Sequence, residues 1–276
     1  MILKAINRDQ SKEEVITVTQ QARAIGYTSI NYDIIYGLPF QKEEHIKDTI
    51  ELVKEMRPDR LAFYGYAHVP WKSKGQRAFS SKDLSHGIEK HKLELLGDSM
   101  LRSAGYKAIA MDHYALPTDN LYKAYKNGKL FRNFMGFTDT TTQCQIGLGN
   151  SAISDSGTMY MQNEKSVEGY QQLVVEYGHA LIKGHKRSEM EIIVGRHILD
   201  LICNDETTFN NTPIDRDIQQ ICENRITELK NDGLIEMIKN KLNITSSGKT
   251  FVRNTCASLD PYISTTQDEN RFSMAI

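Results

Sequence analysis

The sequence has no excess of charge of one sign. Lys and Arg together number 34 and Asp and Glu 35, which gives a formal net charge of −1. A strongly basic chain would favour a nucleic acid or an anionic membrane surface as a partner. Balanced charge gives no reason to expect either, although local clusters could still bind anions. We therefore expect neither nucleic acid nor membrane among the partners.

Long apolar runs are also missing. No run approaches the roughly 18 residues that span a bilayer. The N-terminus does not show the order of a signal peptide, in which positive charge precedes an apolar stretch. We therefore expect the protein in the cytoplasm.

Cysteine is scarce and dispersed. The four cysteines are Cys144, Cys203, Cys222 and Cys256. Their separations do not make a disulfide framework, and none has the close spacing of a zinc or iron–sulfur site. We expect no metal ligands among them and interpret them as buried free thiols.

Helix, glycine corner and strand follow one another repeatedly in the first half of the chain. A capping box at Ser11-Lys12-Glu13-Glu14 begins a helix that ends at Gly26, and a second helix from about Leu84 ends at Gly105-Tyr106. The expected strands cover residues 27–35, 61–64 and 108–111, and a crossover helix carries Ile46, Ile50, Val53 and Met56. This repeat predicts a β/α barrel or a doubly wound sheet, and periodicity does not decide between them.

Beyond about Lys165 the pattern changes to long helical stretches, which indicates a second domain. Near its end, a helix over 215–231, strands over 234–238 and 242–245, and a last helix capped by Ser246-Ser247 resemble a winged helix. The surrounding chain is not basic enough for strong phosphate contacts. We therefore interpret the wing as a packing module and disfavour a nucleic-acid-binding function.

Asp33 is a candidate binding residue. It lies between Ile30 and Ile34-Ile35, and an ionised carboxylate within an apolar strand is costly unless a partner satisfies it. A ligand hydroxyl, such as that of a ribose, would do so. An internal arginine, for which Arg8 is a candidate, or backbone amides would do so as well. The residues alone leave these alternatives open.

Other polar residues stand near the expected strand ends. Asp112-His113 follows the strand at 108–111, where either residue could be a general acid or base, or the two could form a structural pair. We assign no catalytic residue. Cations that could bind carboxylates, or simply be solvated at the surface, gather in Trp71–Arg77 and, with a neighbouring amide, at Lys129, Arg132 and Asn133.

Several segments carry a resemblance to a known family. They are YDIIYGLP at 32–39, MDHYALPTD at 111–119, LFRNFMGFT at 130–138 and GLGNSAIS at 147–154. These segments resemble the oxygen-independent coproporphyrinogen III oxidases, which are radical S-adenosylmethionine enzymes of haem synthesis. The similarity extends from Ala5–Arg8 to Leu201–Asn204 and so covers nearly the whole chain.

The resemblance implies a fold. Residues 1–165 would form the later part of an open β/α barrel with its site at the carboxyl ends of the strands. Residues 166–276 would form a mostly helical C-terminal domain with the winged-helix-like end.

The resemblance also implies which residues bind S-adenosylmethionine. Arg8 would contact it through the guanidinium, and Asp33 would bind the nucleoside. Ala67 and Ile153 would contact it at positions of close backbone approach, the latter after the tight turn of Gly147-x-Gly149.

One defining motif lies outside the matched segments. The Cys-x3-Cys-x2-Cys sequence that holds the [4Fe-4S] cluster in this family lies upstream of them, and the four cysteines here cannot form it. We therefore expect the chain to be the latter part of a larger enzyme, inactive without its N-terminal part. The implied reaction is the oxidative decarboxylation of coproporphyrinogen III to protoporphyrinogen IX.

Two points within the superfamily stay open. Met135 replaces a glutamine with which many members hold a second S-adenosylmethionine, so that second site is in question. The alternative function is that of a haem-binding chaperone without oxidase activity. The sequence RNFMGFT at 132–138 favours the oxidase, because the chaperone branch has an aromatic-rich His-Asn motif there.

Overall fold

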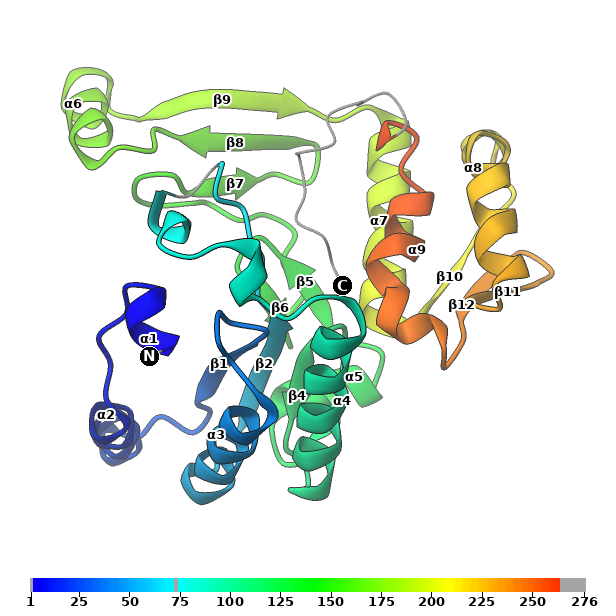
Figure 1. Cartoon of the computed structure of the whole chain (residues 1–276). Helices are drawn as coiled ribbons and strands as arrows, with labels where there is room; N and C mark the ends of the chain where they lie inside the picture. The colour runs from blue at the N-terminus through cyan, green and yellow to red at the C-terminus, as the bar shows by residue number, and fades with distance from the viewer. Residues whose placement is uncertain (1, 72–73, 264–276) are drawn as a thin grey trace. The chain divides into compact units, whose positions relative to one another are not determined.

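The computed structural model describes residues 2–71 and 74–263. They form a mixed α/β fold (Figure 1), as the sequence predicts. The chain divides into two compact units, and the division falls after Lys123. Within the described residues, no helix is long and apolar enough to cross a membrane.

The first unit is built from helices and a four-stranded sheet. Its elements in chain order are α1 (Ile2–Ala5), α2 (Lys12–Ile25), β1 (Asn31–Tyr36), α3 (Glu43–Met56), β2 (Arg60–Gly65), η1 (Lys74–Arg77), η2 (Ser81–Asp83), α4 (Gly87–Ser103), β3 (Lys107–Ala108), β4 (His113–Ala115) and the start of α5 (Asn120–Lys126). The capping box of Ser11 and Glu14 is present, and Gly26 ends α2 in the left-handed conformation, as expected.

The sheet has the strand order β1-β2-β4-β3, so β1 lies at an edge of it. β1 and β2 are parallel, and α3 connects them as the expected crossover helix. The strand expected at 108–111 is wrong in its bounds. Met111 has a left-handed φ of 49°, so the chain turns there and forms an antiparallel hairpin of β3 and β4 instead. The first strand also begins later than expected, at Asn31.

The core of this unit lies between the sheet and two helices. α3 and α4 lie side by side in Figure 1 and cover the same face. Fully buried side chains from α3, β2 and α4 meet there, among them Ile46, Ile50, Leu61 and Leu101. A Cβ on Gly97 of α4 would lie 2.2 Å from the ring of Phe63, so a glycine is required for α4 to pack this closely on β2.

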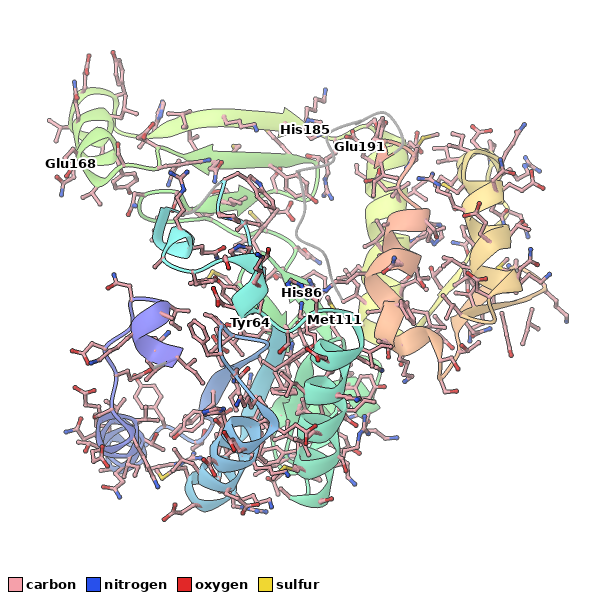
Figure 2. The ribbon with its side chains drawn as sticks, in the orientation of Figure 1. Tyr64, His86, Met111, Glu168, His185 and Glu191 are labelled. Carbon is pink, nitrogen blue, oxygen red and sulfur yellow. The ribbon has the colours of Figure 1, made fainter. Side chains whose placement is uncertain are left out.

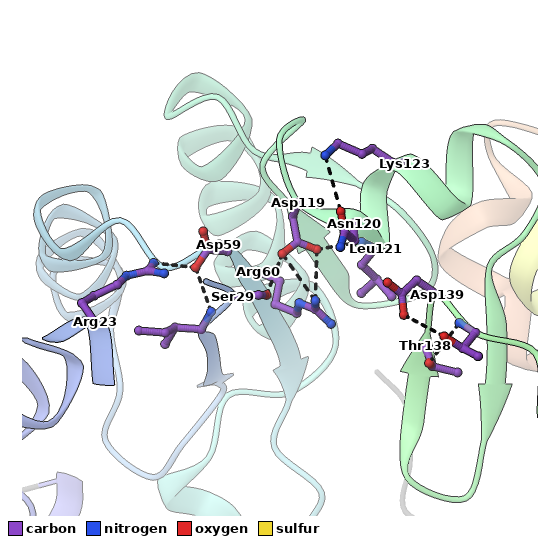
Figure 3. A network of polar contacts seen from close by, with 12 residues as sticks. Arg23, Ser29, Asp59, Arg60, Asp119, Asn120, Leu121, Lys123, Thr138 and Asp139 are labelled. Atoms are coloured by element: carbon purple, nitrogen blue, oxygen red, sulfur yellow. Dashed lines mark hydrogen bonds and ion pairs between the residues drawn. The ribbon is translucent and has the colours of Figure 1, made fainter. Parts of the chain in front are cut away.

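A buried carboxylate connects the segments at the amino ends of the strands (Figure 3). Asp119 accepts hydrogen bonds from the Ser29 hydroxyl at 2.6 Å and the Leu121 amide at 2.7 Å. It also forms an ion pair with Arg60 of β2 at 3.3 Å, and its side chain is only 1% exposed. The carboxylate therefore connects three segments, which are the loop before β1, the start of β2 and the start of α5.

We expect Asp119→Ala to lower the free energy of unfolding by about 3 kcal/mol, because it leaves Arg60 and two hydrogen-bond donors without their acceptor. Urea unfolding followed by circular dichroism measures this. The exposed Asp48 of α3 provides a matched control, and Asp48→Ala should change stability by no more than about 0.5 kcal/mol. Equal losses in the two variants would contradict the assigned role.

The second unit begins at Ala124 and contains two small sheets, a hairpin and three longer helices in its described part. Its elements after α5 are β5 (Phe131–Asn133), β6 (Gly136–Thr138), β7 (Ile153–Asp155), β8 (Met159–Asn163), α6 (Val167–Tyr177), β9 (Leu181–Lys186), α7 (Glu189–Asn204), β10 (Glu206–Thr208), α8 (Pro213–Asn231), β11 (Ile235–Ile238), β12 (Lys241–Ile244), η3 (Gly248–Phe251) and α9 (Val252–Ser258).

The winged-helix-like end is present. α8, the β11–β12 hairpin and α9 follow in the predicted order, and β10 adds a third strand that the sequence pattern did not show. β8 pairs with β9 across the domain boundary expected at residues 165 and 166. The functional division at that boundary stays a prediction.

Three of the four thiols are buried as expected, and Cys144 is not. Cys203, Cys222 and Cys256 lie in α7, α8 and α9, and burial raises the pKa of Cys203 and Cys256 to about 12. Cys144 is exposed because it lies in the segment between β6 and β7, outside the helical core.

A buried histidine and aspartate connect α7, β10 and α8. His197 and Asp215 are both fully buried, with His197 Nε2 3.1 Å from Asp215 Oδ1. The other ring nitrogen of His197 lies 2.7 Å from the Thr207 hydroxyl. Burial lowers the pKa of His197. Burial alone would raise the pKa of Asp215, but hydrogen bonds from His197, Asn210 and Thr212 lower it.

We expect the second unit to lose stability as the pH falls below about 6.5, the ordinary pKa of histidine. The unfolded chain takes up a proton there that buried His197 resists, so the stabilisation is complete above that pKa and is lost progressively as the pH falls from it to the lower pKa of folded His197. Asp215 titrates at lower pH. Urea unfolding between pH 7 and 5 should show this slope, and His197→Gln should flatten it. The exposed His179→Gln is the control and should leave the slope unchanged.

Candidate functional site

The face of the sheet opposite α3 and α4 carries the polar side chains. Side chains alternate along a strand, and Ile34, Leu61, Phe63 and Tyr114 belong to the core. Their neighbours in sequence therefore occupy the other face. These are Asp33 and Ile35 of β1, Ala62 and Tyr64 of β2, and His113 of β4. Asp33, Tyr64 and His113 thus share one face. Asp33 and His113 lie level with Ala62 in the middle of β2, and Tyr64 lies nearer the carboxyl end of that strand.

The charges of several residues act on the phenol of Tyr64, which is labelled in Figure 2. Burial raises the pKa of its phenol, the negative charges of Asp33 and Asp112 raise it further, and the positive charge of Arg8 lowers it. Asp112 reaches the site because its carbonyl accepts the Phe63 amide hydrogen bond at 2.8 Å. The fold therefore brings Arg8 and Asp33, two of the residues predicted from the sequence, into the surroundings of one phenol.

Arg8 and Asp33 also line one pocket of about 810 Å³, formed with α2, β1 and α3. The expectation that Asp33 is costly to bury is wrong, because the side chain is exposed on an edge strand. It accepts a hydrogen bond from Asn31 at 2.8 Å. Arg8 is exposed too and donates to the Gln10 side chain at 3.1 Å. Both groups are accessible to a ligand.

Ala67 lies two residues beyond the end of β2, exposed, in the loop that leaves the sheet. Its carbonyl accepts a hydrogen bond from Gln76 Nε2 at 3.1 Å. The same Gln76 side chain accepts from the Val69 amide at 2.6 Å. The backbone at Ala67 is therefore held in place by a side chain from farther along the chain.

Ile153 begins β7 in the second unit. A Cβ on Gly147 would lie within 3 Å of the carbonyl carbon, oxygen and nitrogen of Ile153, so glycine is needed at 147 for the two backbone segments to approach. The tight geometry expected near Gly147-x-Gly149 is thus present. The structure does not bring Ile153 into one unit with Arg8, Asp33 and Ala67.

The other residues that the sequence analysis singled out lie in several different parts of the chain. Asp112 and His113 form a pair, with Nδ1 2.8 Å from Oδ1. Met135 is 85% exposed on the hairpin of β5 and β6, where Arg132 lies over the Phe137 ring. Lys129 is exposed. The cationic run at 71–77 includes residues 72 and 73, which are outside the described residues.

The sequence did not predict the loop contacts of Gln41, Gln76 and Lys90. Gln41 holds the loop after β1, accepting from the Leu38 amide and donating to the Ile35 carbonyl, both at 3.2 Å. Lys90 is buried and reaches the Tyr66 carbonyl at 3.3 Å. The sequence signal that could have indicated the position of Lys90 was a glycine at or just after the end of each parallel strand. These glycines are Gly37 and Gly65, which leave space for its side chain.

The described residues do not supply a cluster site. Among residues 2–71 and 74–263, no three His, Cys, Asp or Glu side chains gather in a way that could hold a metal ion. They fit a nucleoside better, since an arginine, an aspartate and a fixed backbone segment occur in the same unit.

Comparison with known proteins identifies the class of the fold. No protein-family model matches the chain. A solved structure of coproporphyrinogen III oxidase from Escherichia coli, described as a radical SAM enzyme, matches with a TM-score of 0.88. The match has 34% sequence identity and covers 95% of this chain and 62% of that one. The fold is thus the radical SAM fold of that enzyme.

Proteins of similar sequence show which enzymes the chain resembles. The chain is 36% identical over its whole length to the oxygen-independent coproporphyrinogen III oxidase of Salmonella typhimurium, and 36% identical to that of Pseudomonas aeruginosa. It spans 61% of the length of each. The resemblance predicted from the sequence motifs is therefore confirmed.

We expect charge changes at Arg8 and Asp33 to shift the titration of Tyr64 in opposite directions. Asp33→Asn removes a negative charge and should lower the pKa of Tyr64, whereas Arg8→Ala removes a positive charge and should raise it. NMR of protein labelled at tyrosine Cζ measures both shifts, with Tyr64→Phe assigning the signal. The exposed Tyr177 serves as internal control. Shifts of the same sign in both variants would contradict the arrangement.

Proposed function

We propose that the protein carrying this chain is an oxygen-independent coproporphyrinogen III oxidase. It would decarboxylate two propionate side chains of coproporphyrinogen III oxidatively, giving the vinyl groups of protoporphyrinogen IX in haem synthesis. The observation that carries this proposal is the likeness of the whole chain, in sequence and fold, to enzymes with that name. We further propose that the remaining length found in the relatives supplies the [4Fe-4S] ligands, and that the chain alone is inactive.

The site supports S-adenosylmethionine as a ligand of this chain. The Arg8 guanidinium suits the methionyl carboxylate, and the exposed Asp33 carboxylate suits the ribose hydroxyls. The Ala67 backbone in the fixed loop after β2 would meet the adenosyl group, and the resemblance implies Ile153 as a further contact of the cofactor. When bound beside a reduced cluster, this cofactor supplies the radical that removes hydrogen from a propionate.

In this proposal the residues of the chain bind S-adenosylmethionine and orient it. Ligands of α/β sheets lie beyond the carboxyl ends of the strands, which is where the loops after β1 and β2 are held by Gln41 and Gln76. The phenol of Tyr64 is neutral at neutral pH, as in any ordinary tyrosine, and burial and the charges of Asp33 and Asp112 raise its pKa further. It can therefore donate a hydrogen bond without adding charge.

The second candidate is a haem-binding chaperone of the same superfamily. It would share the fold and would bind haem without oxidising a porphyrinogen. Nothing in the described site favours haem, since the histidine on the polar face, His113, is paired with Asp112. The oxidase is therefore the better supported function.

A chimera tests the proposal. The matching part of the Salmonella typhimurium oxidase is replaced by this chain, and the purified chimera is reconstituted anaerobically. Cluster absorbance checks folding, and the conversion of coproporphyrinogen III is followed by fluorescence of the oxidised products. We expect protoporphyrin only when S-adenosylmethionine is present. A folded chimera that carries its cluster and binds haem, but converts no substrate, would favour the chaperone.

We expect Asp33→Asn to weaken S-adenosylmethionine binding by one to two decades in that chimera. The loss of one charge-assisted hydrogen bond costs roughly 1.5–3 kcal/mol, and each 1.4 kcal/mol is about tenfold in affinity. Isothermal titration measures the affinity, with Asp48→Asn on the exposed surface of α3 as control. Unchanged affinity in the Asp33 variant would remove this residue from the site.

A further inference from the structure

Side chains hold three backbone groups of the loop that follows β2. We define the β2 exit loop as Tyr66–Val69. The Tyr66 carbonyl accepts from Lys90 Nζ at 3.3 Å, and the Ala67 carbonyl accepts from Gln76 Nε2 at 3.1 Å. The Val69 amide donates to Gln76 Oε1 at 2.6 Å. One amide side chain and one ammonium thus set the direction of successive peptide groups.

Lys90 reaches this loop by crossing the ends of both parallel strands. It lies in the first turn of α4 and is only 8% exposed. A Cβ on Gly37 would lie 3.3 Å from its Cγ, and a Cβ on Gly65 would lie 3.0 Å from its Cε. Gly37 also has a φ of 78°, which favours glycine. Both glycines therefore leave the space through which the lysine passes.

The position of this lysine has an energetic cost. Burial disfavours the charged ammonium and lowers the pKa of Lys90, while Glu94 acts in the opposite direction. An apolar side chain would fill the same space without that cost. The ammonium is useful at this position because it binds the Tyr66 carbonyl, at the carboxyl ends of the strands where a ligand would lie.

We infer that Gln76 and Lys90 are positioning residues, which hold the β2 exit loop in the conformation that presents the Ala67 backbone to an adenosyl group. The inference rests on the proposed function. A backbone group can recognise a ligand only when its direction is fixed before binding, because ordering a loose loop upon binding weakens affinity. Gln76 fixes the peptides on both sides of His68, and Lys90 fixes the preceding one.

The test separates loop order from ligand binding. Gln76→Ala, Gln76→Glu and Lys90→Met are compared with the controls Gln20→Ala and Lys92→Met, which change exposed residues on α2 and α4. Hydrogen exchange of the purified protein reports on the amides of the exit loop. We expect Gln76→Ala to speed exchange at Val69 at least tenfold. Gln76→Glu should leave Val69 protected, since a carboxylate still accepts that hydrogen bond.

Affinity is measured by titration with S-adenosylhomocysteine, which carries the adenosyl group but cannot be cleaved to a radical. We expect Gln76→Ala and Lys90→Met to weaken binding about tenfold, and the controls to match the unaltered protein. Gln76→Glu should weaken binding to a similar extent although Val69 stays protected, because the Ala67 carbonyl loses its donor. Thermal unfolding shows that each variant is folded.

Two results would overturn the inference. One is a folded Gln76→Ala or Lys90→Met variant that binds S-adenosylhomocysteine as tightly as the unaltered protein. The other is a Gln76→Ala variant with unchanged exchange at Val69. Absence of binding by the unaltered protein would count against the proposed function and the inference together. The exchange data would still show separately whether the loop is held by Gln76.

Discussion

Burial of one face of the sheet beneath α3 and α4 is the constraint on which the first unit depends. Because side chains alternate along a strand, packing Ile34, Leu61 and Phe63 into that core directs Asp33 and Tyr64 to the opposite face. The parallel pairing of β1 and β2 then places the loops that follow the two strands at the same end of the sheet. The apolar packing therefore decides which charged groups lie near Tyr64. A shift of one residue in either strand would move its apolar side chains to the polar face and its polar side chains to the core.

In the second unit, buried polar contacts have the corresponding organising role. His197 and Asp215 connect helices and a strand of the winged-helix-like end. In the sheet of β7, β8 and β9, the Arg187 guanidinium lies 4.5 Å over the Tyr160 ring and 3.7 Å from the Asp155 carboxylate. This cation contacts residues of β7 and β8 at once. Arg187 thus supports the sheet where β7 ends and β8 begins.

Periodicity and glycine corners predicted the elements well where local signals dominate. The capping box, the crossover helix and the order of the winged-helix-like end needed only neighbouring residues. The hairpin of β3 and β4 was missed because its turn residue, Met111, is not a usual turn former, so the apolar run continued through it. The exit-loop contacts could not be predicted either, since Lys90 lies 24 residues beyond Tyr66. The glycines that admit it show only that space is needed.

At Asp33 the structure replaces the sequence argument for a candidate site with a different one. The sequence argument assumed burial and inferred a ligand from the cost of an unsatisfied carboxylate. The structure places that carboxylate on an exposed edge strand, where water can solvate it. Its suitability for binding comes from its surroundings instead. Arg8 lines the same pocket, Tyr64 lies on the same face, and the adjacent loops are held by side chains. Accessible groups on a rigid support lose little freedom when a ligand binds, so this arrangement favours recognition without stored strain.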